Sequence, residues 1–202
     1  YGEAAYVFRT DDGGATYGQV AKLRANDGAA GDEFGWSVAI DGDTVVVGSP
    51  CDDDDGSCSG SAYIFRTTDG GAAYNQLAKL TAADAAADDY FGESVAIAGN
   101  TVVVGTYRWL EGSGVAYVFR TSDSGATYAQ VAKLTASDAA EDDRFGIYVA
   151  IDGITIVVGA YNNGNTERYQ YDGSGAAYVF RTSDGGATYG QVAKLTASDA
   201  AA

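Results

Sequence analysis

Short apolar runs alternate with polar, glycine-containing turns along the whole chain, and the same runs return at a regular interval. A Phe-Gly pair occurs at positions 34, 91 and 145, so the interval is first 57 and then 54 residues. Each pair is followed by two apolar runs of strand length, which a glycine turn separates. Runs rich in Val, Ile and aromatic residues between Gly, Asp and Asn are typical of β-strands joined by tight hairpins. We therefore predict an all-β chain built from an internal repeat.

Each repeat contains four such runs, and no window has the sustained periodicity of a helix. The first run of the repeat occupies residues 34–40, 91–97 and 145–151, and the second occupies 44–48, 101–105 and 155–159. The third run occupies residues 5–10, 62–67, 116–121 and 177–182, and the fourth occupies 19–23, 76–80, 130–134 and 191–195. Four-stranded antiparallel units repeated at this interval predict blades of β-propeller type, which stand around a central axis.

Two patterns within the runs indicate how the blades pack. Residues 45–47 are three consecutive valines, and residues 6–8 are Tyr, Val and Phe. A strand that is apolar on both faces is buried on both faces, so we expect every blade to be packed between neighbours. The fourth run carries a repeated lysine, Lys22 in its first copy, and we expect this lysine to protect an outer edge strand.

The order of the runs predicts one repeat domain that begins inside a blade. Residues 1–33 supply a half blade, and residues 34–90, 91–144 and 145–202 supply three blades, which makes about three and a half. Propellers close with about four to eight blades. An incomplete blade has a free strand edge, and such an edge is a template for pairing with another chain.

We therefore expect the chain to associate with itself, and two assemblies are open. Two chains of three and a half blades each would close a ring of seven, or each half blade would be completed by the next chain in a head-to-tail fibre. If the chain is complete, the fibre is favoured. The remaining alternative is that the sequence is a window of a longer repeat protein.

Charge and composition exclude several classes of function. The net charge is −16, which argues against nucleic acid and anionic membrane surfaces as partners, and no stretch reaches the length of a membrane span. The chain contains no His, so Ser-His-Asp and Cys-His nucleophiles are excluded. Carboxylates are plentiful, so a glycosidase pair remains open as the weakest alternative. We predict that the protein is not an enzyme and requires no cofactor.

The stretch Cys-Asp-Asp-Asp-Asp-Gly-Ser-Cys raises two questions of chemistry. Cys51 and Cys58 are predicted to form a local disulfide, which indicates an extracellular or cell-surface location; two free surface thiols are the alternative. Between them lie four consecutive carboxylates, which would suit a hard cation such as calcium: Asp52, Asp53, Asp54 and Asp55. The usual alternating spacing of calcium ligands is missing, so a solvated acidic loop tip is favoured over a calcium site.

The unit running from KLTAADAAADDYFGESVAIAGNTVVVGTY to GSGVAYVF closely resembles the FG-GAP repeat, the blade unit of the integrin α-chain propeller. The resemblance covers essentially the whole chain and implies extracellular adhesion or scaffolding without one assigned activity. Integrin blades carry a calcium loop between their first two strands. The turns at that position here, such as residues 41–43, are too short for it.

A second resemblance concerns the turn between the third and fourth runs, which is similar to the Asp-box found in sialidases. Thr10, Asp12, Gly14, Thr16 and Tyr17 fit its pattern. In sialidases this motif lies away from the chemistry and holds a hairpin together. The repeated aspartates are therefore expected to cap turns.

The loops between the second and third runs differ from repeat to repeat, and loops on a rigid scaffold are where binding usually resides. Several of their aromatic residues are candidates for stacking on sugars or anchoring a protein partner: Tyr107, Trp109, Tyr161, Tyr169 and Tyr171. We predict an extracellular structural or adhesive module that self-associates. The alternative is a lectin that binds glycans through these loop aromatics.

Overall fold

The computed structural model describes residues 3–106, 112–164 and 173–199, and over these residues the chain is all-β. The strands are β1 Ala5–Arg9, β2 Gly18–Leu23, β3 Val38–Asp41, β4 Thr44–Ser49, β5 Ser61–Arg66, β6 Asn75–Leu80, β7 Ser94–Ala98, β8 Thr101–Gly105, β9 Ala116–Arg120, β10 Ala129–Leu134, β11 Phe145–Asp152, β12 Thr155–Ala160, β13 Ala176–Arg181 and β14 Gly190–Leu195. In these described ranges no helix is long and apolar enough to span a membrane.

The strands form one two-stranded sheet, β1–β2, and three four-stranded sheets, β3–β6, β7–β10 and β11–β14. Within each sheet, strands that follow one another in the sequence are neighbours and run antiparallel. This is the meander of a propeller blade. The prediction of three and a half four-stranded blades is confirmed. We call the sheet β1–β2 the half blade, and the other sheets the second, third and last blade.

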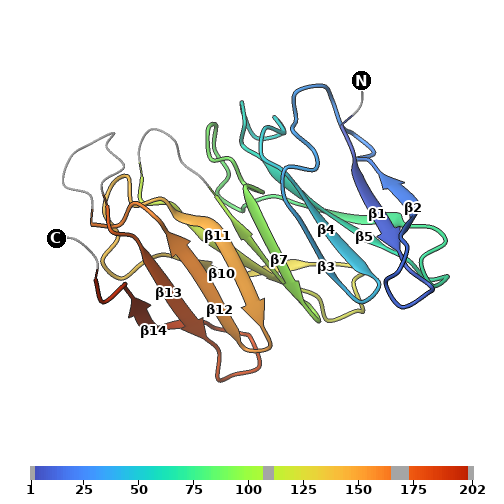
Figure 1. Ribbon diagram of the computed structural model, residues 1–202. Helices are drawn as coiled ribbons and strands as arrows, with labels where there is room; N and C mark the ends of the chain where they lie inside the picture. The colour runs from blue at the N-terminus through green and yellow to red at the C-terminus, as the bar shows by residue number, and fades with distance from the viewer. Residues whose placement is uncertain (1–2, 107–111, 165–172, 200–202) are drawn as a thin grey trace.

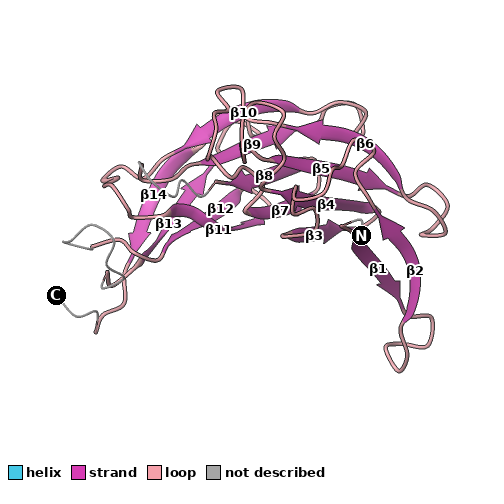
Figure 2. Cartoon of the chain, turned by 90° about the horizontal axis from the view of Figure 1, so that it is seen from above, coloured by secondary structure: helices cyan, strands magenta, loops and turns pink. Residues whose placement is uncertain are grey.

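The blades stand side by side along an open arc (Figure 1). Seen from above, the half blade and the last blade occupy opposite ends of this arc, and the two ends do not meet (Figure 2). The chain is therefore part of a propeller ring with two end surfaces. These surfaces are the parts of the blades that have no neighbour along the arc.

Tight hairpins between the first two strands of each complete blade fix the register. Asp41 pairs with Thr44, and the two residues between them make the turn. Gly42, Gly99 and Gly153 each open such a turn with φ of 55°, a conformation that glycine adopts without steric cost. The predicted two-residue hairpins are thereby confirmed.

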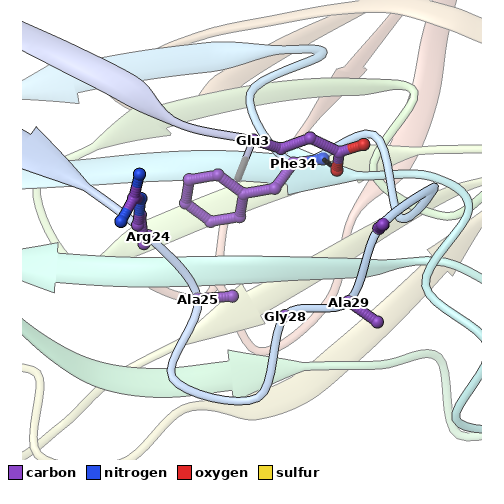
Figure 3. A pocket seen from close by; sticks show the side chains of 7 residues that line it. Glu3, Arg24, Ala25, Gly28, Ala29 and Phe34 are labelled. Carbon is purple, nitrogen blue, oxygen red and sulfur yellow. Dashed lines mark hydrogen bonds between the residues drawn. The ribbon is translucent and has the colours of Figure 1, made fainter. Parts of the chain in front are cut away.

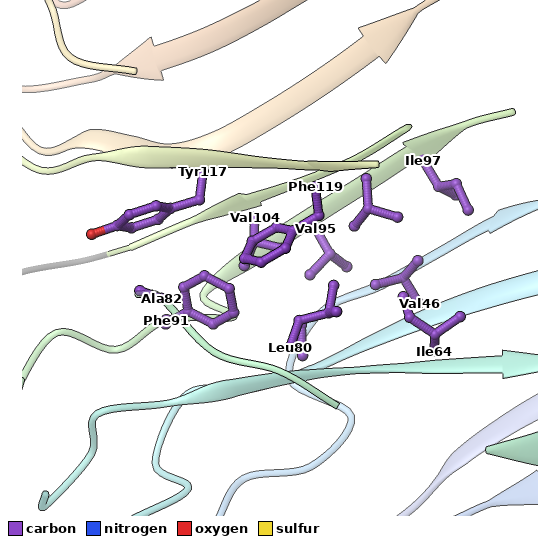
Figure 4. Packing of buried hydrophobic residues seen from close by; sticks show 12 residues of the cluster. Val46, Ile64, Leu80, Ala82, Phe91, Val95, Ile97, Val104, Tyr117 and Phe119 are labelled. Carbon is purple, nitrogen blue, oxygen red and sulfur yellow. The ribbon is translucent and has the colours of Figure 1, made fainter. Parts of the chain in front are cut away.

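The core lies between the blades, because each four-stranded sheet presents apolar side chains on both faces. Val102, Val103 and Val104 are all fully buried, with Val103 in one cluster and its two neighbours in another. Figure 4 shows the cluster between the second and third blades, where Leu80 faces Phe91 and Phe119. The prediction that interior blades are covered on both sides is confirmed for the third blade. In the second blade, Val38 and Ile40 of β3 are 60% and 59% exposed, since the half blade, over the described residues, has no first and second strand to stand against them.

The half blade does not follow that prediction. Tyr6 and Phe8 are 50% and 56% exposed, although their sequence pattern is that of a strand covered on both faces. In the described part of the chain, no strand pairs with the second edge of β1 and no blade stands against its outer face. Only one of the two faces of β1 that the sequence predicts to be covered is therefore covered.

Candidate functional site

The acidic loop of the second blade is closed by a disulfide between Cys51 and Cys58, as predicted. Its first carboxylate is not at a solvated tip. Asp52 is buried and accepts a hydrogen bond of 2.6 Å from the Tyr63 hydroxyl. Lys79 forms ion pairs with Asp52 at 3.1 Å and with Asp54 at 2.5 Å. Its single ammonium group is thus shared by two carboxylates of this loop and by Asp27, with which it pairs at 2.8 Å. Asp53, Asp54 and Asp55 are exposed, as expected of a solvated tip, and only Asp52 departs from that expectation.

The remaining members of the predicted cation site lie close to this pair. Asp53 accepts a hydrogen bond of 2.8 Å from the Cys58 amide, and the Asp55 amide donates to Ser59 Oγ at 3.1 Å. Across the described ranges no group of three or more His, Cys, Asp or Glu side chains is arranged to hold a metal ion. Calcium binding stays a prediction.

One of the five candidate aromatic residues falls in the described part of the chain. Tyr161 is partly exposed, and its ring centroid lies 5.4 Å from the guanidinium carbon of Arg144. Its hydroxyl also accepts a hydrogen bond from Arg144 Nη1. Tyr107, Trp109, Tyr169 and Tyr171 lie outside the described residues. The glycan or protein ligand predicted for these aromatics stays a prediction.

The half blade carries a cavity of about 250 Å³ beside Phe34 (Figure 3). Glu3 lines it, and its carboxylate accepts hydrogen bonds from the amides of Phe34 at 2.8 Å and Gly31 at 3.2 Å. In the following blades the corresponding amides, of Phe91 and Phe145, donate to backbone carbonyls instead. Glu3 therefore replaces a backbone acceptor, and its carboxylate closes a loop.

The turns between the third and fourth strands have the structure expected of Asp-boxes. Asp123 accepts hydrogen bonds from the Thr127 hydroxyl at 2.6 Å and from the Thr127 amide at 2.9 Å. Thr121 donates to the same carboxylate at 2.7 Å. These bonds, led by the one from the Thr127 hydroxyl, lower the pKa of Asp123 to about 2. The aspartate caps the turn, as the resemblance implied.

The repeated lysine of the fourth strand links neighbouring blades, which the sequence interpretation missed. Lys133 of the third blade pairs at 2.5 Å with Asp84, in the connector that follows the second blade. Lys194 of the last blade pairs at 2.6 Å with Asp138, one connector further on. The lysines lie on edge strands, as expected, and in addition they contact a neighbouring connector.

A tyrosine of the third strand completes each of these contacts. The hydroxyls of Tyr117 and Tyr178 each donate at 2.9 Å to the same aspartates, and the lysine ammonium groups lie 5.5 Å from the ring centroids. Burial, with the hydrogen bond to Asp138, raises the pKa of Tyr178 to about 12. Hydrogen bonding to Lys194 holds the pKa of Asp138 below its usual value. We call this arrangement the Lys-Tyr-Asp triad.

Further hydrogen bonds repeat at every junction. Gln76 and Gln130 accept from the amides of Asn26 and Ala83 in the preceding connector, at 2.9 and 3.0 Å. Arg66 donates to the carbonyl of Ser124 in the next blade. Each junction therefore combines an apolar cluster with a glutamine–amide hydrogen bond and a lysine–aspartate ion pair. A signal was present in the sequence, because these residues recur in every copy, but recurrence alone does not reveal which blade a side chain contacts.

The comparisons with known proteins agree with this architecture. The FG-GAP repeat model matches residues 17–65, 69–119 and 122–180, which is well over half of the chain. No curated protein matches the sequence.

Among solved structures, the crystal structure of Sqt1 from Saccharomyces cerevisiae is similar, with a TM-score of 0.50 and 12% identity. The similarity covers 82% of this chain and 37% of Sqt1, so the chain spans well under half of that protein. An identity this low is evidence of a shared fold alone. The three repeat matches and the four-stranded blades together show that the chain belongs to the FG-GAP repeat family.

Proposed function

We propose that this FG-GAP chain is an extracellular structural or adhesive module that associates with itself through the two end surfaces of its arc and performs no enzymatic chemistry. FG-GAP repeats and a disulfide are typical of proteins outside the cell. In the acidic loop the carboxylates of Asp52, Asp53 and Asp54 make ion pairs or hydrogen bonds within the protein, and so do the junction carboxylates of Asp84 and Asp138. They are therefore accounted for by structure.

The observation that carries the proposal is the exposure of residues whose counterparts are buried. Tyr6 and Phe8 on the half blade are about half exposed, whereas the same positions in the three complete blades are 0–4% exposed. Large aromatic side chains gathered on one face of a soluble protein mark an interaction surface. The free edge of β1 beside them offers unpaired backbone groups to a further strand.

The opposite end of the arc also exposes an apolar residue whose counterparts are buried. Leu195 of β14 is 53% exposed, while Leu23, Leu80 and Leu134 at the same position are 2–4% exposed. The two end surfaces differ from one another, so a contact between them is head-to-tail. Such a contact closes into a ring if the rotation between copies allows it, and otherwise continues into a fibre. We favour the fibre.

Light scattering over a concentration series, combined with electron microscopy, tests this function. We expect the mass to rise with concentration and the micrographs to contain filaments. A ring of two copies would support association but not the fibre. A particle that keeps the mass of one chain, 20.7 kDa, at every concentration would overturn self-association.

A further inference from the structure

Two internal junctions hold a complete Lys-Tyr-Asp triad, and its members come from two blades. The lysine and tyrosine belong to the later blade, and the aspartate lies four residues after the last leucine of the earlier one. Asp84 follows Leu80 in this way, and Asp138 follows Leu134. The junction between the half blade and the second blade keeps the ion pair, between Asp27 and Lys79 at 2.8 Å, although the Tyr63 hydroxyl there donates to Asp52.

The two ends of the arc carry the two unmatched parts of one more triad. On the half blade, Lys22 lies 5.3 Å from the ring centroid of Tyr6, as Lys79 does over Tyr63. In the described part of the chain no carboxylate is paired with Lys22. At the other end, Asp199 lies four residues after Leu195, in the same Thr-Ala-Ser-Asp sequence that contains Asp138. Asp199 likewise has no lysine partner in the described part of the chain.

The apolar parts of the end surfaces match in the same way. Inside the arc, Leu134 of the third blade packs in one cluster with Tyr178 and Phe180 of the last blade. Leu195 is the counterpart of Leu134, and Tyr6 and Phe8 are the counterparts of the two aromatics. Joining the two ends in the internal geometry therefore buries exposed apolar side chains and pairs opposite charges at the same time.

One departure in the last blade favours a second copy over a further complete blade as the occupant of this end. At the internal junctions, Ser37 and Ser94 donate to the carbonyls of Gly92 and Gly146, which belong to the Phe-Gly loop of the next blade. The last blade has Tyr148 at this position, 69% exposed. A further complete blade at this end would bring its own Phe-Gly loop, and that loop would contact the Tyr148 ring where the internal junctions have a small serine.

The surroundings of two equivalent glycines, Gly105 and Gly159, confirm where the Tyr148 side chain lies. A methyl group added to Gly105 would sit 1.9 Å from the Gly146 carbonyl oxygen of the next blade. The corresponding methyl on Gly159 would instead meet Tyr148, at 3.5 Å from its Cβ. Tyr148 therefore covers the surface that elsewhere receives a Phe-Gly loop. Over the described residues the half blade consists of β1 and β2, the third and fourth strands of a blade, and these contain no Phe-Gly loop.

We propose that the last blade of one copy stacks on the half blade of the next in the geometry of the internal junctions, with Asp199 of one copy paired to Lys22 of the other. The proposal rests on the self-association proposed above and names its contact. Gln19, the counterpart of Gln76 and Gln130, would accept a hydrogen bond from the amide of Ser198 across the same contact, as Gln191 does from Ser137 at 2.9 Å.

Two charge reversals, Lys22→Glu and Asp199→Lys, test the contact. Each variant alone places like charges at the junction, which opposes association. We expect the concentration for half-assembly, measured by light scattering, to rise at least about tenfold for each. In an equimolar mixture, an assembly in which the two variants alternate has opposite charges at every junction, so we expect the mixture to assemble in the wild-type range.

The controls separate the possible failures. Asp55→Lys makes the same change of net charge as Asp199→Lys, on a loop of the second blade, and should leave assembly unchanged. Circular dichroism checks that each variant is folded. If the wild type stays monomeric, self-association itself fails. If the wild type assembles and both reversed variants assemble equally well, or if the mixture does not recover, self-association stands and the proposed contact is overturned.

Discussion

Strands β1 and β9 have the same five residues, Ala-Tyr-Val-Phe-Arg, and very different surroundings. In β9 the first four residues are buried, whereas in β1 only the first is. The third blade supplies β9 with a strand on each side, and its neighbours cover both faces. The half blade supplies β1 with one strand and one covered face. Burial here is therefore a property of the stacking of blades, which a local sequence does not contain.

This difference has an energetic scale. Burying a large apolar side chain is worth about 1.5–3 kcal/mol relative to leaving it exposed. Tyr117 and Phe119 obtain this stabilisation within the chain, and Tyr6 and Phe8 do not. Joining the end surfaces of two copies would recover part of it, against the loss of translational and rotational freedom on association.

The largest expected effect comes from truncating the same aromatic in the two strands. Phe119→Ala removes a buried ring that packs edge-to-face on Phe91, with centroids 5.8 Å apart. We expect it to lower the free energy of unfolding by about 3–5 kcal/mol. Phe8→Ala, in the identical pentapeptide, should cost the dilute monomer less than about 1 kcal/mol. Denaturant unfolding followed by circular dichroism measures both, and equal losses would contradict the comparison.

A second pair of variants contrasts an internal junction with the end of the arc. Gly105→Ala places a methyl group against the Gly146 carbonyl of the next blade, and we expect a loss of about 1–3 kcal/mol from overpacking. Gly159→Ala, at the same position of the last blade, meets only ordinary contact distances with Tyr148. Its thermal midpoint should stay close to that of the wild type. A larger loss at Gly159 would show that the two sites do not differ as described.

The ion pairs of the triads should contribute less. Lys133 and Asp84 are both partly exposed, so we expect Lys133→Ala to lower the stability of the monomer by no more than about 1 kcal/mol. Lys22→Ala should leave the unfolding of the dilute monomer unchanged, because Lys22 makes no ion pair in the described residues. Its effect should appear in assembly alone. A destabilised Lys22→Ala monomer would mean that this lysine has a role within its own chain.

The smallest effect is the dependence of the same contacts on pH. Hydrogen bonds to Lys133 and Lys194 hold the pKa values of Asp84 and Asp138 below the usual value. A carboxyl whose pKa is lower in the folded state contributes stability above its unfolded pKa of about 4, and this is lost as the pH falls through the folded pKa. We therefore expect acid to weaken the wild type slightly more than a Lys133→Ala, Lys194→Ala double variant. Identical acid sensitivity would argue against the pairing.

The sequence pattern was sufficient to predict the blades but not the contacts between neighbouring blades. The β-branched runs and the glycine turns identified the strands, and the spacing of Cys51 and Cys58 identified the disulfide. The pattern could not show that Lys133 reaches Asp84, because that contact depends on how one blade is rotated against the next. For the same reason it predicted Tyr6 and Phe8 to be covered. Tyr148 was recognisable as a departure from Ser37 and Ser94, but its meaning depends on what those serines contact.

The central claim is that the two end surfaces are the two parts of one blade junction. It is tested most directly by placing single cysteines at Tyr6 and Leu195 in one chain and adding a short bis-maleimide under conditions where the wild type assembles. We predict a ladder of covalently joined copies on a denaturing gel, and none when Leu195→Cys is paired with a cysteine at Asp55. A double variant that assembles but yields no intermolecular product would contradict the claim.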